Sequence, residues 1–156
     1  MNAVDIPDFG AFAIEHLVCD FNGTLAVDGA LLPGVADALN ALAHKMQVHV
    51  VTADTFGSAR RALEGVDCRI HLLRPDEQRH AKLAYLFVLG PQRSICIGNG
   101  RNDVDMLRAA AVGIAVINAE GAAGETLVAA DVVCNSIADA LDLLDHPKRL
   151  LATLRA

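Results

Sequence analysis

Short apolar runs rich in Val, Ile and Leu alternate along this 156-residue chain with longer segments that have helical spacing. The pattern predicts strands at 17–19, 47–51, 68–73, 94–97, 113–117 and 132–133. It predicts helices at 35–44, 58–64, 76–89, 102–111, 120–130 and from 134 onward, with a break at Pro147. Such alternation is typical of an α/β fold with a mostly parallel, doubly wound sheet in three layers.

The composition agrees with that architecture. Hydrophobic residues make up 53% of the chain, aromatic residues only 4%, and tryptophan is absent. The core must therefore be built from Ala, Val, Leu and Ile, which suit a parallel sheet covered by helices on both faces. The length fits one ordinary domain, and no linker or repeat interrupts it, so we expect a single domain over residues 1–156.

Charge and cysteine spacing argue against several classes of protein. The formal net charge of −6 argues against a nucleic-acid-binding protein, which needs clustered Lys and Arg. No apolar run approaches ~18 residues and no signal-peptide pattern is present, so we expect neither a membrane span nor secretion. The four cysteines, Cys19, Cys68, Cys96 and Cys134, form no CxxC pair, which argues against a zinc cluster and favours a reduced, cytoplasmic setting.

Polar residues follow three of the expected strands: Asp20, Thr52 and Asn99. Ligands bind beyond the carboxyl ends of the strands in such sheets, so we expect these three side chains to share one crevice. Asp20 precedes the segment 21–24, in which Gly23 permits a tight turn whose N–H groups could bind an anion. A carboxylate beside such a turn can attack a phosphoryl group, although a turn-forming or helix-capping role is the common alternative.

Four segments in order resemble the motifs of the haloacid dehalogenase superfamily. The segment 17–25 resembles the first motif, an apolar strand ending in DxDGT, and 48–52 resembles the second, a strand ending in Thr or Ser. Lys82 matches the third motif and 98–103 (GNGRND) matches the fourth, GDGxND. The stretch 98–131 is especially similar to the phosphorylation domain of P-type ATPases, and the whole chain resembles its soluble, stand-alone relatives.

The resemblance assigns catalytic roles to four residues. Asp20 would attack phosphorus and bind magnesium, and the backbone carbonyl of Asn22 would be a second ligand of the metal. Thr52 would bond the transferring phosphoryl oxygens, while Lys82 would neutralise their charge.

The same resemblance implies further metal and substrate contacts. Asn99 would complete the Mg²⁺ shell, Asp103 would join it directly or through water, and Asn102 would orient its neighbours. Substrate contacts fall on Phe21, Gly23, Thr24 and Ala53.

Two asparagines depart from the pattern of the superfamily. Asn22 stands where its phosphatases carry the acid that shuttles a proton, and Asn99 stands where they carry a charged metal ligand. Asparagine transfers no proton and contributes an uncharged oxygen to a cation, so we expect weak magnesium binding. The ATPases also lack the first of these acids and keep a long-lived phosphoenzyme, so phosphorylation of Asp20 remains compatible with Asn22.

Several assignments have alternatives. Thr52 could belong to a helix N-cap, Lys82 could be a solvated lysine with Arg74 or Arg79 in its role, and Asp103 could complement a helix dipole. Asp28, Asp54 and Arg101 lie close to the same strand ends and could touch substrate. The six histidines show no ligand spacing and are expected on the surface or in packing contacts.

The sequence thus predicts a magnesium-dependent phosphatase that acts on a phosphorylated substrate through an aspartyl-phosphate. One alternative is a weakly active or inactive relative that binds a phosphorylated ligand or a partner protein; another is a dehalogenase. The intervals from Asp20 to Thr52 and from Thr52 to Lys82 are filled by the expected helices and strands, so no cap domain fits there. We therefore expect an open site, which a homo-oligomer could cover.

Overall fold

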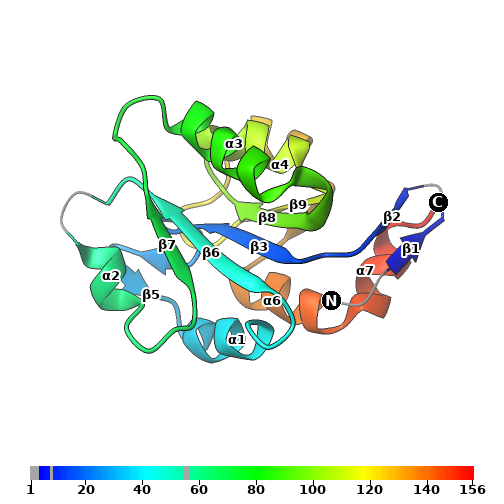
Figure 1. The fold of residues 1–156 in the computed structure, drawn as a ribbon, viewed down its shortest axis with the longest axis horizontal. Coiled ribbons are helices and arrows are strands. Elements are labelled where there is room, and N and C mark those ends of the chain that lie inside the picture. The colour runs from blue at the N-terminus through cyan, green and yellow to red at the C-terminus, as the bar shows by residue number, and fades with distance from the viewer. Residues whose placement is uncertain (1–3, 8, 55–56) are drawn as a thin grey trace.

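Six parallel strands form the central sheet of the computed structural model, which describes residues 4–7, 9–54 and 57–156 (Figure 1). Their order across the sheet is β10-β9-β8-β3-β6-β7. The bounds are β3 His16–Asp20, β6 Gln47–Thr52, β7 Arg69–Leu72, β8 Ser94–Gly98, β9 Val112–Val116 and β10 Val132–Cys134. The expected parallel α/β sheet is confirmed, and β3, which ends at Asp20, lies inside it between β8 and β6.

Helices cover both faces of the sheet (Figure 1). On one face pack α3, α4 and α5, and on the other α1 and α6 lie side by side. The bounds are α1 Val35–Leu42, α2 Ser58–Ala62, α3 Gln78–Leu89, α4 Val104–Ala109, α5 Gly124–Ala129, α6 Ile137–Asp145 and α7 Pro147–Leu154. Two single 3₁₀ turns, Pro91–Arg93 and Arg101–Asp103, precede β8 and α4.

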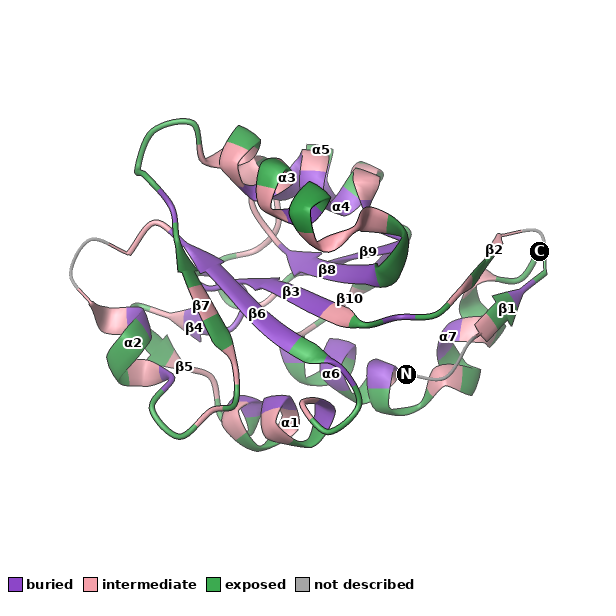
Figure 2. Cartoon of the chain, viewed as in Figure 1, coloured by how far each residue is buried: buried purple, intermediate pink, exposed green. Residues whose placement is uncertain are grey.

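The central strands are buried on both faces, as Figure 2 shows. Along β3, Leu17 and Cys19 join the apolar cluster beneath α1 and α6, while Val18 joins the smaller cluster beneath α3 and α4. This alternation follows from the two-residue period of a strand. Because both faces of β3 are packed, the strand is rigidly held, and its last residue, Asp20, has a fixed position at the carboxyl end of the sheet.

Two antiparallel hairpins were not predicted from the sequence. One joins β1 (Val4–Ile6) to β2 (Gly10–Phe12), and the other joins β4 (Ala26–Val27) to β5 (Ala30–Leu31). The turn of the second hairpin is Asp28-Gly29, in which both residues have positive φ, 51° and 80°. Asp-Gly is a strong hairpin signal, but strands of two residues are too short to show alternation.

The helix expected at 120–130 begins only at Gly124. Residues 118–120 form a turn instead, and Gly121 has a left-handed φ of 72° that a helix cannot contain. Glu120 therefore lies in the loop that follows the carboxyl end of β9.

The connections between strands are short. Within residues 4–7, 9–54 and 57–156, the β4–β5 hairpin and α1 connect β3 to β6, and no cap domain is present. None of the helices in this part of the chain combines the length and the apolar character needed to cross a bilayer.

Candidate active site

The carboxyl ends of β3, β6 and β8 surround a pocket of about 320 Å³, called the strand-end pocket below. Its lining consists of Asp20, Asn22, Thr52, Ala53, Gln78, Asn99, Gly100, Asn102 and Glu120. The structure therefore brings together the three residues that were expected to share one crevice: Asp20, Thr52 and Asn99.

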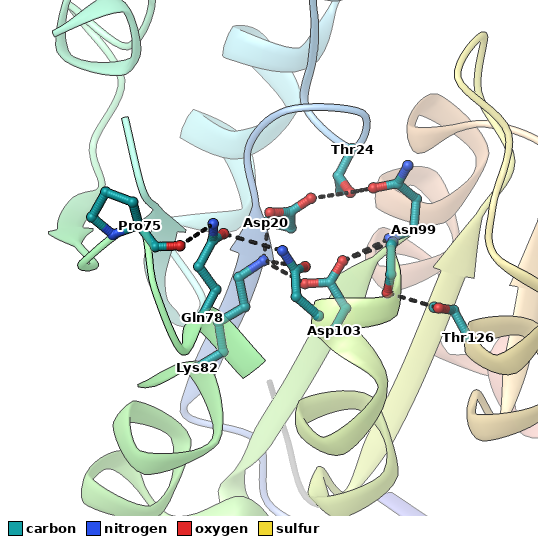
Figure 3. A network of polar contacts seen from close by, with 10 residues as sticks. Asp20, Thr24, Pro75, Gln78, Lys82, Asn99, Asp103 and Thr126 are labelled. Atoms are coloured by element: carbon teal, nitrogen blue, oxygen red, sulfur yellow. Dashed lines mark hydrogen bonds and ion pairs between the residues drawn. The ribbon is translucent and has the colours of Figure 1, made fainter. Parts of the chain in front are cut away.

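A buried lysine contacts the Asp20 carboxylate from the helical layer (Figure 3). Lys82, in the second turn of α3, is 1% exposed, and its Nζ donates to Asp20 Oδ1 at 2.8 Å. It also donates to Asp103 Oδ1 at 2.7 Å and to Asn102 Oδ1 at 3.0 Å. All three protons of the ammonium are thus used, and the lysine bridges the first and fourth sequence motifs.

Burial and charge shift the pKa values of this pair. Burial, followed by the neighbouring Asp103 carboxylate, raises the pKa of Asp20 to about 7, although Lys82 opposes the shift. Burial lowers the pKa of Lys82, but the ion pairs with Asp20 and Asp103 outweigh it, and the net pKa lies above its ordinary value. Lys82 is therefore charged at neutral pH, as a group that binds phosphate must be.

The other oxygen of Asp20 lies against Thr24. The Thr24 hydroxyl is 3.1 Å from Asp20 Oδ2 and 3.2 Å from Asn99 Oδ1. It has one proton, so it donates to only one of these acceptors at a time. Asn99 Nδ2 donates to the carbonyl of Gly121 at 3.0 Å, which turns the amide oxygen of Asn99 toward the first motif.

Asp103 is fully buried and organises the loop of the fourth motif. Its Oδ2 accepts from the backbone N–H groups of Asn99 and Gly100, both at 3.0 Å, while Oδ1 is bound by Lys82. Both of its oxygens are therefore engaged within the protein. The carboxylate fixes the GNG turn and balances the lysine.

Asn102 and Gln78 join the rim of the strand-end pocket. Asn102 Nδ2 donates to Gln78 Oε1 at 3.1 Å, and Gln78 Nε2 donates to the carbonyl of Pro75, also at 3.1 Å (Figure 3). These contacts hold the first turn of α3 against the fourth motif. Asn102 thus contacts both Lys82 and Gln78, and its role of orienting neighbours stays a prediction.

The loop after β9 is tied to both motif loops. Asn118 Nδ2 donates to the carbonyls of Gly23 and Thr24 at 3.1 and 2.8 Å, and its Oδ1 accepts from Ile137 N. Ala123 N donates to the carbonyl of Asn99 at 2.9 Å. The residues between these two tethers, including Glu120, are therefore held beside the pocket.

Of the four residues expected to contact substrate, only Ala53 is part of the pocket lining. The side chain of Phe21 lies in the apolar core with no exposed surface, so only its backbone can border the site. Four expected site residues do not belong to the lining: Gly23, Thr24, Lys82 and Asp103.

The rivals of Lys82 for the cationic role lie elsewhere. Arg79 forms two 2.8 Å bonds to Asp105, and Arg74 is exposed outside the lining of the pocket. Asp54 accepts from Ser58 Oγ and Ala59 N, which places its carboxylate at the start of α2.

Sequence reasoning missed Gln78 and Glu120 as pocket residues. Gln78 belongs to a segment read only as helix. Glu120 was placed inside a helix, and Gly121 is the signal that could have moved it into the loop.

The donors at the pocket suit a hard divalent cation. Asp20, Asn99 and the neighbouring backbone offer oxygen atoms, which magnesium and calcium prefer. Gly23 leaves a cradle here, because a Cβ on it would come within 2.5 Å of Asn99 Nδ2. Across the described ranges, with their gaps at 1–3, 8 and 55–56, no three His, Cys, Asp or Glu residues converge as ligands, so amide and backbone oxygens must contribute.

The fold and site together define a class: parallel α/β proteins with an aspartate at the end of a central strand and a buried lysine beside it. A family model described as haloacid dehalogenase-like hydrolase matches residues 80–140. Uncharacterized protein MJ0073 of Methanocaldococcus jannaschii is 48% identical over 64 residues, which are 41% of this chain and 69% of that protein. The chain belongs to the haloacid dehalogenase superfamily.

Solved structures share the whole fold. The 3-deoxy-D-manno-octulosonate 8-phosphate phosphatase of Moraxella catarrhalis, in complex with magnesium, phosphate and KDO, has a TM-score of 0.71 at 16% identity and covers 91% of this chain and 94% of its own. The cobalt-bound deoxy-D-mannose-octulosonate 8-phosphate phosphatase of Haemophilus influenzae has a TM-score of 0.67 at 18% identity, with 87% and 91% covered. At these identities the likeness concerns the fold.

Proposed function

We propose that the chain is a divalent-metal-dependent phosphatase that forms an aspartyl-phosphate on Asp20. The observation that carries the proposal is the contact between the Asp20 carboxylate, which lines the strand-end pocket, and the buried Lys82 ammonium 2.8 Å away. Family membership supports it, as do the two similar structures, whose proteins are phosphatases. Mg²⁺ is the proposed metal and an unidentified phosphate monoester the proposed substrate.

In the first step a carboxylate oxygen of Asp20 attacks phosphorus. The new Asp–O–P bond forms as the bond from phosphorus to the ester oxygen breaks, and the alcohol leaves after taking a proton from water. Lys82 holds positive charge beside the phosphoryl oxygens, and the hydroxyl of Thr52 lies at the pocket wall to donate to them. The backbone carbonyl of Asn22, the Asn99 amide and Asp20 would hold the cation, which would supply further positive charge to the phosphoryl group.

In the second step water attacks the phosphorus of the acyl phosphate. The bond to Asp20 breaks, inorganic phosphate leaves, and the proton lost by the water passes to solvent or to phosphate. Asn22 lines the pocket but accepts no proton, so this step lacks the base that the superfamily places there. We infer that dephosphorylation is slower than phosphorylation.

The test is hydrolysis of p-nitrophenyl phosphate with Mg²⁺ and with a chelator in its place. Metal-dependent release of phosphate is expected from the parent protein, and Asp20→Asn should abolish it. Asp28, one of the residues that could have touched substrate, lies outside the pocket lining at the exposed turn of the β4–β5 hairpin. Asp28→Asn is therefore the matched control, and asparagine tolerates its φ of 51°. Equal rates in the parent and in Asp20→Asn would refute the proposal.

The alternative is a protein that binds a phosphorylated ligand and turns it over slowly or not at all. Asn22 and Asn99 favour it, since they remove a proton carrier and a charged ligand from the pocket. Saturable phosphate binding without hydrolysis of any phosphate ester or acetyl phosphate would support this alternative.

A further inference from the structure

The cation site of the proposed phosphatase lacks negative charge. Asn22 and Asn99 contribute neutral oxygens, and Asp20 shares its charge with Lys82. Asp103 has one oxygen on Lys82 and the other on two backbone N–H groups. A divalent cation here would meet one carboxylate that already has a cationic partner, and the affinity of such sites depends on the charge of their ligands.

Glu120 brings another carboxylate to the same place. It lines the strand-end pocket together with Asp20, Asn22 and Asn99. The point that a Cβ on Gly23 would occupy lies 2.7 Å from Glu120 Oε2 and 2.9 Å from Asn99 Oδ1. The carboxylate of Glu120 and the amide of Asn99 therefore lie around the same point beside Gly23, on one side of the first-motif turn.

The loop that carries Glu120 is fixed on both sides of it. Asn118, two residues before, donates to the carbonyls of Gly23 and Thr24. Gly121, the next residue, accepts from Asn99 Nδ2, and its N–H donates to the carbonyl of Asn118 at 3.1 Å. The loop of Glu120 is thus hydrogen-bonded to the first-motif loop and to the fourth-motif loop, which carry the proposed metal ligands.

The Glu120 carboxylate is also uncommitted. Within the part of the chain that the structure describes, no hydrogen bond or ion pair engages it, whereas Glu125 pairs with Arg101 at 3.2 Å. An exposed, unpaired carboxylate beside two neutral amides is available to a cation and costs little to desolvate.

We propose that Glu120 is a further ligand of the divalent cation held by Asp20 and Asn99. It supplies the negative charge that the uncharged side chains of Asn22 and Asn99 do not provide. The inference rests on the proposed function for the place of the metal, but its test measures binding and requires no turnover. A role as the base of dephosphorylation is the competing assignment; the metal role is favoured because the carboxylate lies beside Asn99.

The experiment is titration of the full-length protein with Mg²⁺ by calorimetry and with Mn²⁺ by electron paramagnetic resonance. Glu120→Gln should lower the affinity for both cations at least about 10-fold, because even removing an outer partner of a metal ligand typically costs about 10- to 100-fold. Glu125→Gln removes the same charge five residues later, outside the pocket lining, and should bind like the parent. Adding Asn99→Asp to Glu120→Gln should recover much of the loss.

Equal affinity in Glu120→Gln and the parent would overturn the inference. So would unchanged affinity combined with a longer-lived phosphoenzyme, which would make Glu120 the base. Weakened binding in a protein that hydrolyses no phosphate ester would uphold Glu120 and refute the proposed function. Hydrolysis that depends on Asp20, with metal affinity unchanged by Glu120→Gln, would support the proposed function and refute the role of Glu120.

Discussion

The Lys82 ammonium lies 2.8 Å from the Asp20 carboxylate although 62 positions separate the two residues in the sequence. Both are buried, so each depends on the other for charge balance. Lys82→Met should therefore destabilise the fold, because Asp20 and Asp103 would remain buried without a cation. Breaking such a buried pair costs roughly 3–5 kcal/mol, measurable by urea unfolding at pH 7.

Arg79→Met is the control for that measurement, since its pair with Asp105 lies at the surface. It should lower the unfolding free energy far less than Lys82→Met does. An equal decrease in the free energy of unfolding in the two variants would mean that burial does not increase the contribution of the Lys82 ion pairs to stability.

Gly23 and Gly34 separate the effect of backbone strain from that of crowding at the pocket. Both have a left-handed φ, 82° and 81°, but a Cβ on Gly34 meets nothing within 4 Å. Replacing either by alanine should cost about 1 kcal/mol from the backbone. Only Gly23→Ala should also lower phosphatase activity and metal affinity, because its Cβ would displace Asn99. Equal activity in the two variants would exclude this crowding.

His49 should make stability depend on pH. It is fully buried on β6, with His16 Nδ1 3.0 Å from its Nε2 and Tyr85 Oη 2.7 Å from its Nδ1. Burial, aided by the charges of His16, Arg69 and His71, lowers its pKa from 6.5 to about 4. The folded protein then binds fewer protons than the unfolded chain between these values, so stability falls as the pH drops below about 6.5.

Between pH 7 and pH 5 this contribution amounts to at most about 2 kcal/mol, from 1.36 kcal/mol per pH unit. Urea unfolding of the parent and of His49→Val at both pH values measures it. The variant should lose less stability than the parent over that interval, whatever its absolute stability. Parallel losses would show that His49 is protonated in the folded protein.

The parallel sheet and the succession of strands and helices along the chain were predictable because most buried strands are apolar runs followed by polar residues. Residues 17–19 form such a run, and residues 48–51 are three valines interrupted only by His49; both segments lie in the centre of the sheet. The site was predictable where residues follow strands directly, as Asp20 and Thr52 do. The short β4–β5 hairpin escaped prediction because each of its strands has two residues and no measurable period.

The partners of the site residues could not be predicted from the sequence. Lys82 contacts Asp103 through the packing of α3 on the turn before α4, which no local spacing encodes. Glu120 could not be placed from the sequence because an apolar, helix-favouring stretch surrounds it, and the left-handed φ of Gly121 is a property of the folded loop. The core position of Phe21 depends on which face of the first-motif turn meets α1, again a tertiary property.

Asn22 should set the lifetime of the phosphorylated intermediate. Asn22 is exposed and lines the strand-end pocket together with Asp20, and it stands where the motif of the superfamily has an acid. An amide accepts no proton, and a positioned base contributes typically ~10²–10⁴-fold in rate. The aspartyl-phosphate should therefore accumulate when the parent protein turns over acetyl phosphate with Mg²⁺. Asn22→Asp should shorten its lifetime by about that factor, while Asp20→Asn should form no adduct.

Acid-quenched mass spectrometry of the Asp20 peptide, sampled over time after the donor is removed, gives the lifetime. Steady hydrolysis that requires Asp20 but leaves no adduct in the parent protein would place the slow step at or before phosphorylation, and the role assigned to Asn22 would then be wrong.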